Sequence, residues 1–189
     1  MRDDDGMEVL ELADGEAWER WLEANHDTAP EAWLRVGKKG SGLTTLTVPE
    51  ALDVALCFGW IDGQRRGLDE VSFLQRYCPR RARSTWSQVN VDKIAALEAA
   101  GRMRPSGWAQ VEAAKADGRW AAAYEPMRTA SVPDDLAAAI AADPVADAAF
   151  AQLGKADRYD VMLPVLKATA PRRREAAVRR AVERLRGGH

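Results

Sequence analysis

The 189-residue chain is long enough for one ordinary domain, or for one domain with a helical appendage, without disulfides or metals to stabilise it. Hydrophobic residues make up 47% of it and charged residues 30%, a balance that excludes a disordered chain. The formal net charge of −2 disfavours a general nucleic-acid binder, and no apolar run approaches the roughly 20 residues of a membrane span.

The first residues and the cysteines bear on the cellular compartment. The start, MRDDDGMEVLEL, lacks the basic patch and apolar core of a secretory signal. Only two cysteines occur, Cys57 and Cys78, and they form no CxxC pair. Both features indicate a reducing, cytoplasmic setting. The segment GKKGSG lacks the ending of a nucleotide-binding loop, so we expect a surface turn there and no cofactor.

The N-terminal half predicts short strands mixed with helices. Asp14 is expected to cap one helix, and a strongly apolar helix is expected over residues 48–58, ended by Gly59. Apolar alternation and turn residues predict four strands, at 7–12, 31–38, 60–65 and 71–78.

Beyond these strands the chain is expected to be helical. Asn90 can cap a helix that runs to Ala100, and Pro105 or Ser106 starts another. Residues 119–131 lack periodicity, which predicts a linker.

Proline and capping signals also divide the C-terminal part into helices. Ser131 and Asp134 have the spacing of a capping box, and Asp143 precedes a proline at a first helical position. A last helix is expected after Pro171. Pro164 stands inside a helical stretch, which it should kink or break.

These elements predict an α+β fold in two parts. The first is a small mixed α/β body with a short sheet, over residues 1–125. The second is a helical C-terminal unit over residues 132–189.

Residues 57–90 read CFGWIDGQRRGLDEVSFLQRYCPRRARSTWSQVN. CFGWIDGQ and LQRYCPRRARSTWS, followed by AGRMRPSG and EAAKADGRW, resemble the YdeI/OmpD-associated, or bacteriocin-protection, family of bacterial proteins. The resemblance continues more weakly into the tail from VPDDLAAAI. It implies a stress-linked protein associated with tolerance of antimicrobial peptides or bacteriocins, and the family name implies a link to an outer-membrane porin. It implies no established reaction and no catalytic residues.

The tail departs from the family's pattern at two places. Pro164 interrupts a helix that is usually continuous in the family. Ala176 and Ala177 stand where the family leads us to expect basic residues. These departures concern the function of the tail more than that of the central segment.

Four arginines occur within residues 76–83, and such obligatory charges are difficult to bury. On a strand over 71–78, Arg76 shares a face with Leu74 and Cys78, an unusual place for a solvated charge. We therefore expect a carboxylate partner for Arg76, and Asp62 on the neighbouring strand is the candidate.

The turn PRRARSTWS is expected to project Arg80, Arg83, Ser84 and Ser87 beside Trp86. Guanidinium groups, hydroxyl groups and an aromatic face suit a phosphate or carboxylate joined to a flat group. A helix starting near Asn90 would aim its amides at the same region. The candidate ligand-binding residues are Trp60, Asp62, Gln64, Arg76, Arg80, Arg83, Ser84, Trp86, Ser87 and Asn90.

The same residues also have a structural interpretation. Arginine–carboxylate pairs and arginine–tryptophan stacking can lock a turn onto a sheet, a serine can simply cap the helix, and Trp60 can belong to the core. Only two histidines occur, His26 and His189, which excludes most histidine-based triads and zinc sites. We therefore predict no catalytic residue and no metal site.

Three functions remain open from the sequence. The leading hypothesis is a non-enzymatic stress-response protein that binds an anionic small molecule through the arginine–tryptophan segment, with a protein partner as a further candidate. The second is an enzyme that acts on a phosphorylated or carboxylated small molecule, with Asp62 as its acid–base group. The third is a protein- or nucleic-acid-interaction module that uses the seven arginines of residues 172–186. Most such runs form the solvated face of an amphipathic helix.

Overall fold

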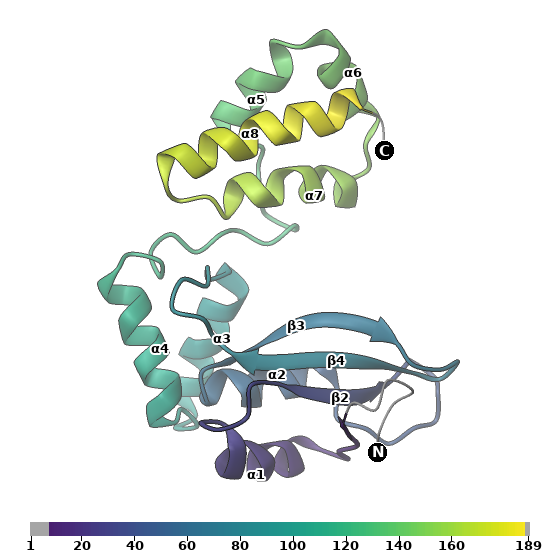
Figure 1. Ribbon diagram of the computed structural model, residues 1–189, viewed down its shortest axis with the longest axis vertical. Coiled ribbons are helices and arrows are strands. Elements are labelled where there is room, and N and C mark those ends of the chain that lie inside the picture. Colours follow the sequence, from purple (N-terminus) through teal and green to yellow (C-terminus); the bar gives the residue numbers. More distant parts are fainter. Residues whose placement is uncertain (1–7, 188–189) are drawn as a thin grey trace. The chain divides into compact units, whose positions relative to one another are not determined.

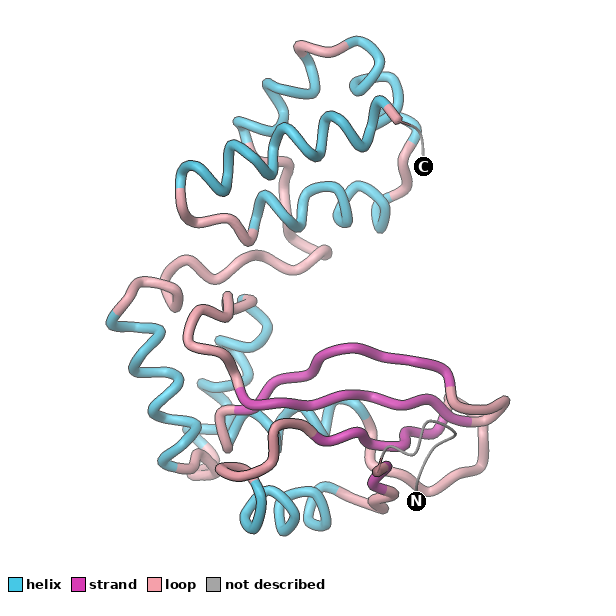
Figure 2. Tube along the Cα trace, in the orientation of Figure 1, coloured by secondary structure: helices cyan, strands magenta, loops and turns pink. Residues whose placement is uncertain are grey.

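The computed structural model describes residues 8–187, which form two compact units (Figure 1). The first unit comprises the chain up to Ser84 together with Asp92–Gly118. The second comprises Thr85–Val91 together with the chain from Arg119 onward. Figure 2 shows that the strands lie in the N-terminal part and that the C-terminal part is helical. The predicted α+β class is therefore confirmed, whereas the domain boundaries at 125 and 132 stay a prediction.

The first unit is built on a four-stranded sheet of order β1-β2-β4-β3. β1 runs parallel to β2, whereas β4 is antiparallel to both β2 and β3. The register between β3 and β4 shifts between Asp62 and Arg65, as in a β-bulge. The strands are β1 (Val9–Leu10), β2 (Ala32–Gly37), β3 (Trp60–Gly67) and β4 (Ser72–Pro79).

Local chemistry explains the first two helices of this unit. Asp14 caps α1 (Gly15–Asn25) as predicted, since its Oδ1 accepts a hydrogen bond from the Ala17 amide at 2.8 Å. α2 (Val48–Cys57) starts with a capping box between Thr47 and Glu50. Gly59 ends α2 with a φ of +75°, a value that favours glycine over other residues.

An aromatic cluster forms the core between α1 and the sheet. The rings of Trp18, Trp60 and Tyr77 are almost inaccessible to solvent, and Trp21 stacks on Trp18 with 5.2 Å between the ring centroids. Trp18 meets Trp60 edge to face at 6.2 Å. α2 packs against α1, β3 and the fourth helix, α4 (Pro105–Ala116). Large aromatic rings thus supply much of the apolar area that holds this unit together.

The helix after the arginine-rich turn starts earlier than predicted. α3 spans Gln88–Ala99, and the amide of Asn90 donates to the Oγ of Ser87 at 3.2 Å. Asn90 therefore lies inside the first turn of the helix, and the prediction that it caps the helix is wrong. Ser87 accepts that bond because its hydroxyl precedes the helix, as a capping side chain must.

The second unit contains four helices that share one apolar core. Leu136, Ile140, Val161, Val165 and Leu185 are all at most 3% exposed. The helices are α5 (Asp134–Ala141), α6 (Pro144–Gln152), α7 (Lys155–Leu166) and α8 (Pro171–Arg186).

Of three predictions about these helices, one is wrong, one is contradicted in part and one is confirmed. α5 begins at Asp134 after Pro133 without a side-chain cap, so Ser131 forms no capping box. α7 contains Pro164 and continues to Leu166, so the expected break does not occur, whereas the kink stays a prediction. Asp143 caps α6 as predicted, by accepting bonds from two backbone amides. Within residues 8–187, no helix combines the length and apolar character required to cross a bilayer.

Candidate anion-binding site

Arg76 is held by a carboxylate, although not by the predicted one. Its Nε donates to Glu31 Oε2 at 2.7 Å, and its Nη2 lies 2.6 Å from the same oxygen. The Trp33 indole donates to the other oxygen of Glu31 at 2.9 Å. The Trp33 bond and, next, the Arg76 bond and charge hold the pKa of Glu31 below its ordinary value. The predicted pairing with Asp62 is therefore wrong, and Arg76 braces β4 against the start of β2.

Arg80 and Trp60 are both buried. Arg80 is only 5% exposed, and its amide donates to the carbonyl of Gly59 at 2.9 Å. Trp60 is 1% exposed, and its indole donates to the carbonyl of His26 at 3.0 Å. The expectation that Arg80 projects from the turn is thus wrong, because this residue anchors the end of β4 beside the start of β3.

The turn after Arg80 does present two arginines to solvent. Arg81 and Arg83 are exposed, and within residues 8–187 no hydrogen bond or ion pair engages either guanidinium group. The backbone of the turn is closed by Ser84, whose Oγ accepts from the Arg81 amide at 3.1 Å. The Ser84 amide in turn donates to the carbonyl of Arg81 at 2.9 Å. Two available guanidinium groups are therefore carried by a closed backbone turn.

Asp62 and Gln64 lie on β3, where both are exposed. Asp62 stands opposite Tyr77 in the register, and its charge adds to the burial that raises the pKa of Tyr77 far above its ordinary range. Next to Gln64, the buried Gln75 donates to the carbonyl of Gly63 at 3.1 Å. Gln75 thereby satisfies the irregular backbone of the bulge, a role that the sequence pattern did not indicate.

The remaining predicted residues belong to the second unit. Trp86 is 1% exposed and meets Trp120 with 4.8 Å between the ring centroids. Its carbonyl accepts from the amide of Tyr124 at 3.0 Å. Ser87 and Asn90 form the start of α3. Trp86 is therefore enclosed and does not present its aromatic face to solvent beside the turn.

The cysteines differ in their surroundings. Cys57 is buried at the end of α2, and burial raises the pKa of its thiol to about 11. Such a thiol is a poor nucleophile at neutral pH. Cys78 on β4 is half-buried. Among the residues that the structure describes, no group of three His, Cys, Asp or Glu side chains is arranged to hold a metal ion.

The arginine-rich tail forms the amphipathic helix α8. Ala177, Ala181 and Leu185 bury one face of it. Ala177, where the family leads us to expect a basic residue, is therefore a core position of this helix. The half-buried Arg174 forms two hydrogen bonds to Asp135. Part of the positive charge of α8 is thus paired with a carboxylate of the same unit.

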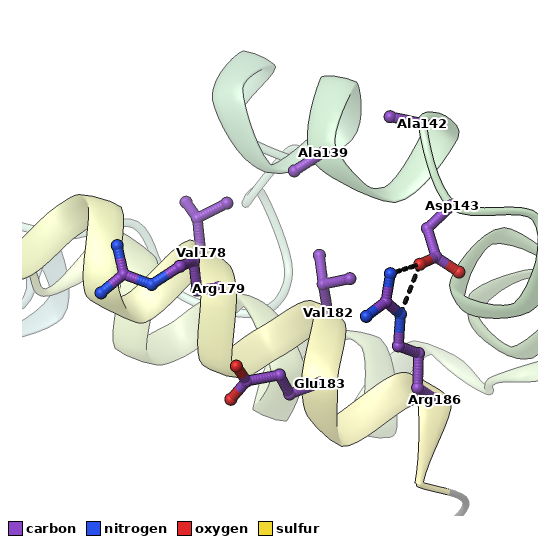
Figure 3. A pocket seen from close by; sticks show the side chains of 8 residues that line it. All are labelled: Ala139, Ala142, Asp143, Val178, Arg179, Val182, Glu183 and Arg186. Atoms are coloured by element: carbon purple, nitrogen blue, oxygen red, sulfur yellow. Dashed lines mark hydrogen bonds and ion pairs between the residues drawn. The ribbon is translucent and has the colours of Figure 1, made fainter.

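Figure 3 shows a pocket of about 320 Å³ between α5 and α8. At one end of it, Arg186 is paired with Asp143, the capping residue of α6. The Ala146 amide, and next Arg186, hold the pKa of Asp143 below its ordinary value. The charges of this end are therefore already balanced by a pair that joins α6 to α8. The apolar walls of the pocket are formed by Ala139, Ala142, Val178 and Val182.

Two family models match the chain. Residues 10–110 match a domain of unknown function, DUF8412, and residues 129–188 match the model described as bacteriocin-protection, YdeI or OmpD-associated. Comparison with curated proteins and with solved structures yielded no match. The predicted family is confirmed, but by the tail, whereas the segment 57–90 falls within the other model. The chain therefore belongs to the DUF8412 family through its N-terminal half and carries a C-terminal domain of the bacteriocin-protection, YdeI or OmpD-associated family.

Proposed function

We propose that the chain is a non-catalytic binding protein that recognises an anionic ligand and acts in tolerance of bacteriocins or antimicrobial peptides. The name of the family whose model matches residues 129–188 supports the biological setting. The exposed pair Arg81 and Arg83 supports the ligand class and is the observation that carries the proposal.

The chemistry of this pair suits an oxyanion. A guanidinium group keeps its charge at any physiological pH and offers five N–H donors in a planar fork. Such a fork binds a phosphate or carboxylate through two parallel hydrogen bonds. Arg81 and Arg83 have no carboxylate partner within residues 8–187 that would have to be displaced first. An anion therefore competes only with water for these donors.

The proposal narrows the ligand-binding set inferred from the sequence. Arg83 stays a residue that contacts the anion, and Arg81 is added as a second one. Ser84 closes the backbone of the turn. Arg80 anchors the turn, because its side chain is enclosed. Arg76 remains paired with Glu31. If Arg76 turned to an added anion, the partly buried carboxylate of Glu31 would lose its counter-ion. Binding is thus assigned to the turn and not to the sheet.

A thermal-shift screen tests this function. We expect a nucleotide, phosphosugar or organic acid to raise the melting temperature, because a ligand at about 100 times its dissociation constant adds roughly 2.7 kcal/mol of stability. The shift should vanish in the double variant Arg81→Gln/Arg83→Gln. It should persist in Arg172→Gln/Arg173→Gln, a matched change of two exposed, unpaired arginines at the start of α8.

Two outcomes would reject the proposal. The first is the absence of a shift with every anion of the screen. The second is an equal loss of the shift in both double variants, because binding would then follow the total charge and not the turn.

In a bacteriocin-sensitive bacterial host, expression of the wild-type chain should raise survival, and expression of the Arg81→Gln/Arg83→Gln variant should not.

A further inference from the structure

The second unit contains a pocket that the proposed function does not use. It has a volume of about 420 Å³, within the roughly 300–1,000 Å³ of small-molecule sites. Its lining combines apolar side chains, Ala130, Leu153 and Met162, with the polar side chains of Lys155, Arg158 and Tyr159. No carboxylate side chain lines it.

The charged side of the pocket belongs to the first turn of α7. Lys155 and Arg158 are three residues apart and therefore neighbours on the helix surface. Arg158 donates through Nη2 to the carbonyl of Ala151 at 2.8 Å, which orients its guanidinium group, while Nη1 has no partner within residues 8–187. Among the described residues 8–187, Lys155 makes only a long contact of 3.5 Å with the carbonyl of Arg128. Two cations thus have donors available at the same opening.

The backbone adds to this positive field. α7 begins after Gly154, which offers no side-chain cap, so the first amides of the helix lack a capping acceptor. These amides and the helix dipole favour a negative charge near Lys155. The acidic residue of this turn, Asp157, is exposed and is not part of the pocket lining.

The apolar wall of the pocket joins the core of the unit. Met162 is 4% exposed, and Leu153 packs against the apolar core of the unit. The Tyr159 hydroxyl donates to the carbonyl of Glu125 at 2.9 Å. Burial, and then the charge of Asp160, raise the pKa of Tyr159. An apolar group placed on this wall would be removed from water at little cost to polar atoms.

We propose that this pocket binds an amphiphilic anion, that is, an apolar group that ends in a carboxylate or a phosphate. The oxyanion lies at Lys155 and Arg158, and the apolar group lies on Leu153 and Met162. This inference goes beyond the proposed function, because it uses a second site in the other compact unit and none of the residues of the arginine turn.

Methionine methyl NMR of the full chain tests the site with octanoate as the probe. Met127 lines the pocket and is 44% exposed, and Met162 forms its wall. Met103, which belongs to the first unit, serves as an internal reference. We expect octanoate to shift the Met127 and Met162 methyl signals with one common saturation curve and to leave Met103 unchanged. Octyl phosphate, titrated in parallel, identifies the preferred head group.

Controls separate charge from apolar burial. Acetate, which lacks the chain, and octanol, which lacks the charge, should each bind at least about tenfold more weakly than octanoate, as loss of a charge-assisted bond or of the apolar contact requires. Lys155→Gln changes an exposed side chain and should weaken octanoate binding about tenfold. Ala130→Phe should block the pocket. Arg172→Gln, on α8, should change nothing.

Three results would overturn the inference. They are equal binding of octanol and octanoate, unchanged octanoate affinity in Lys155→Gln, and the absence of any methyl shift. The variant Arg81→Gln/Arg83→Gln should bind octanoate normally, so failure of this site is distinguishable from failure of the arginine turn.

Discussion

Replacing Glu31 by glutamine tests whether Arg76 is a structural residue. Glu31 accepts two hydrogen bonds, one from the Nε of Arg76 and one from the Trp33 indole, and it forms an ion pair with the Nη2 of Arg76. A buried charged hydrogen bond contributes roughly 1.5–3 kcal/mol, whereas a fully exposed ion pair contributes about 0–1 kcal/mol. The side chains of Arg76 and Glu31 are 23% and 38% exposed, so solvent screens the pair in part. We therefore expect Glu31→Gln to lower the free energy of unfolding by about 1–2 kcal/mol at pH 7.

Urea denaturation followed by tryptophan fluorescence measures this loss, and its pH dependence identifies the cause. The folded-state pKa of Glu31 is lowered from 4.5, so its stabilisation is fully present above that value and disappears as the pH falls through the lowered pKa. The difference between wild type and variant should therefore shrink from pH 7 towards pH 3. Glu16→Gln is the control, because the Glu16–Arg20 pair is exposed and 3.8 Å long, and it should cost less than about 0.5 kcal/mol. A loss equal to that of the control, or one independent of pH, would refute the bracing role of Arg76.

Further changes test the packing and the helix ends. Gly107→Ala should destabilise the protein by about 1–3 kcal/mol in urea denaturation, because the added Cβ would lie 2.2 Å from the carbonyl oxygen of Cys57. The control Gly15→Ala, in the first turn of α1, should be close to neutral, because no atom lies nearer than 3.6 Å to the added Cβ. Asp143→Ala should lower the free energy of unfolding by about 1–2 kcal/mol, because α6 loses its cap. Ser131→Ala should leave the free energy of unfolding almost unchanged, because Ser131 caps no helix. Equal effects of the two variants would contradict the helix starts described above. Cys57, with a pKa of about 11, should react with iodoacetamide at pH 8 only in urea, as peptide mapping can show, and rapid labelling of the folded chain would disprove its burial.

Local signals in the sequence were sufficient for most of the fold. The cap at Asp14, the stop at Gly59 and the cap at Asp143 each depend on one residue and its immediate neighbours, and all three are confirmed. Ser131 failed as a cap because Pro133 and Asp134 place the start of the helix three residues later. Short-range chemistry is therefore predictable except where two starting signals compete.

Long-range partners were not predictable in the same way. Arg76 needed a carboxylate, and the sequence offered Asp62 on one neighbouring strand and Glu31 before the other. Only the register of β4 between two strands decides between them. Burial of Arg80 likewise depends on how the turn meets the end of α2, which no local pattern encodes. Exposed and buried arginines of the same run look alike in sequence, so the exposed pair Arg81 and Arg83 could not be separated from the buried Arg80.

The most direct test of the account is an NMR titration that observes the arginine side-chain Nε–H signals of the wild-type chain with pyrophosphate. We predict that the Arg81 and Arg83 signals move together and saturate with one dissociation constant, while those of Arg172 and Arg173 stay in place. Equal and non-saturating movement of all four signals, or no movement of any, would contradict the claim that the turn after β4 is an anion-binding site.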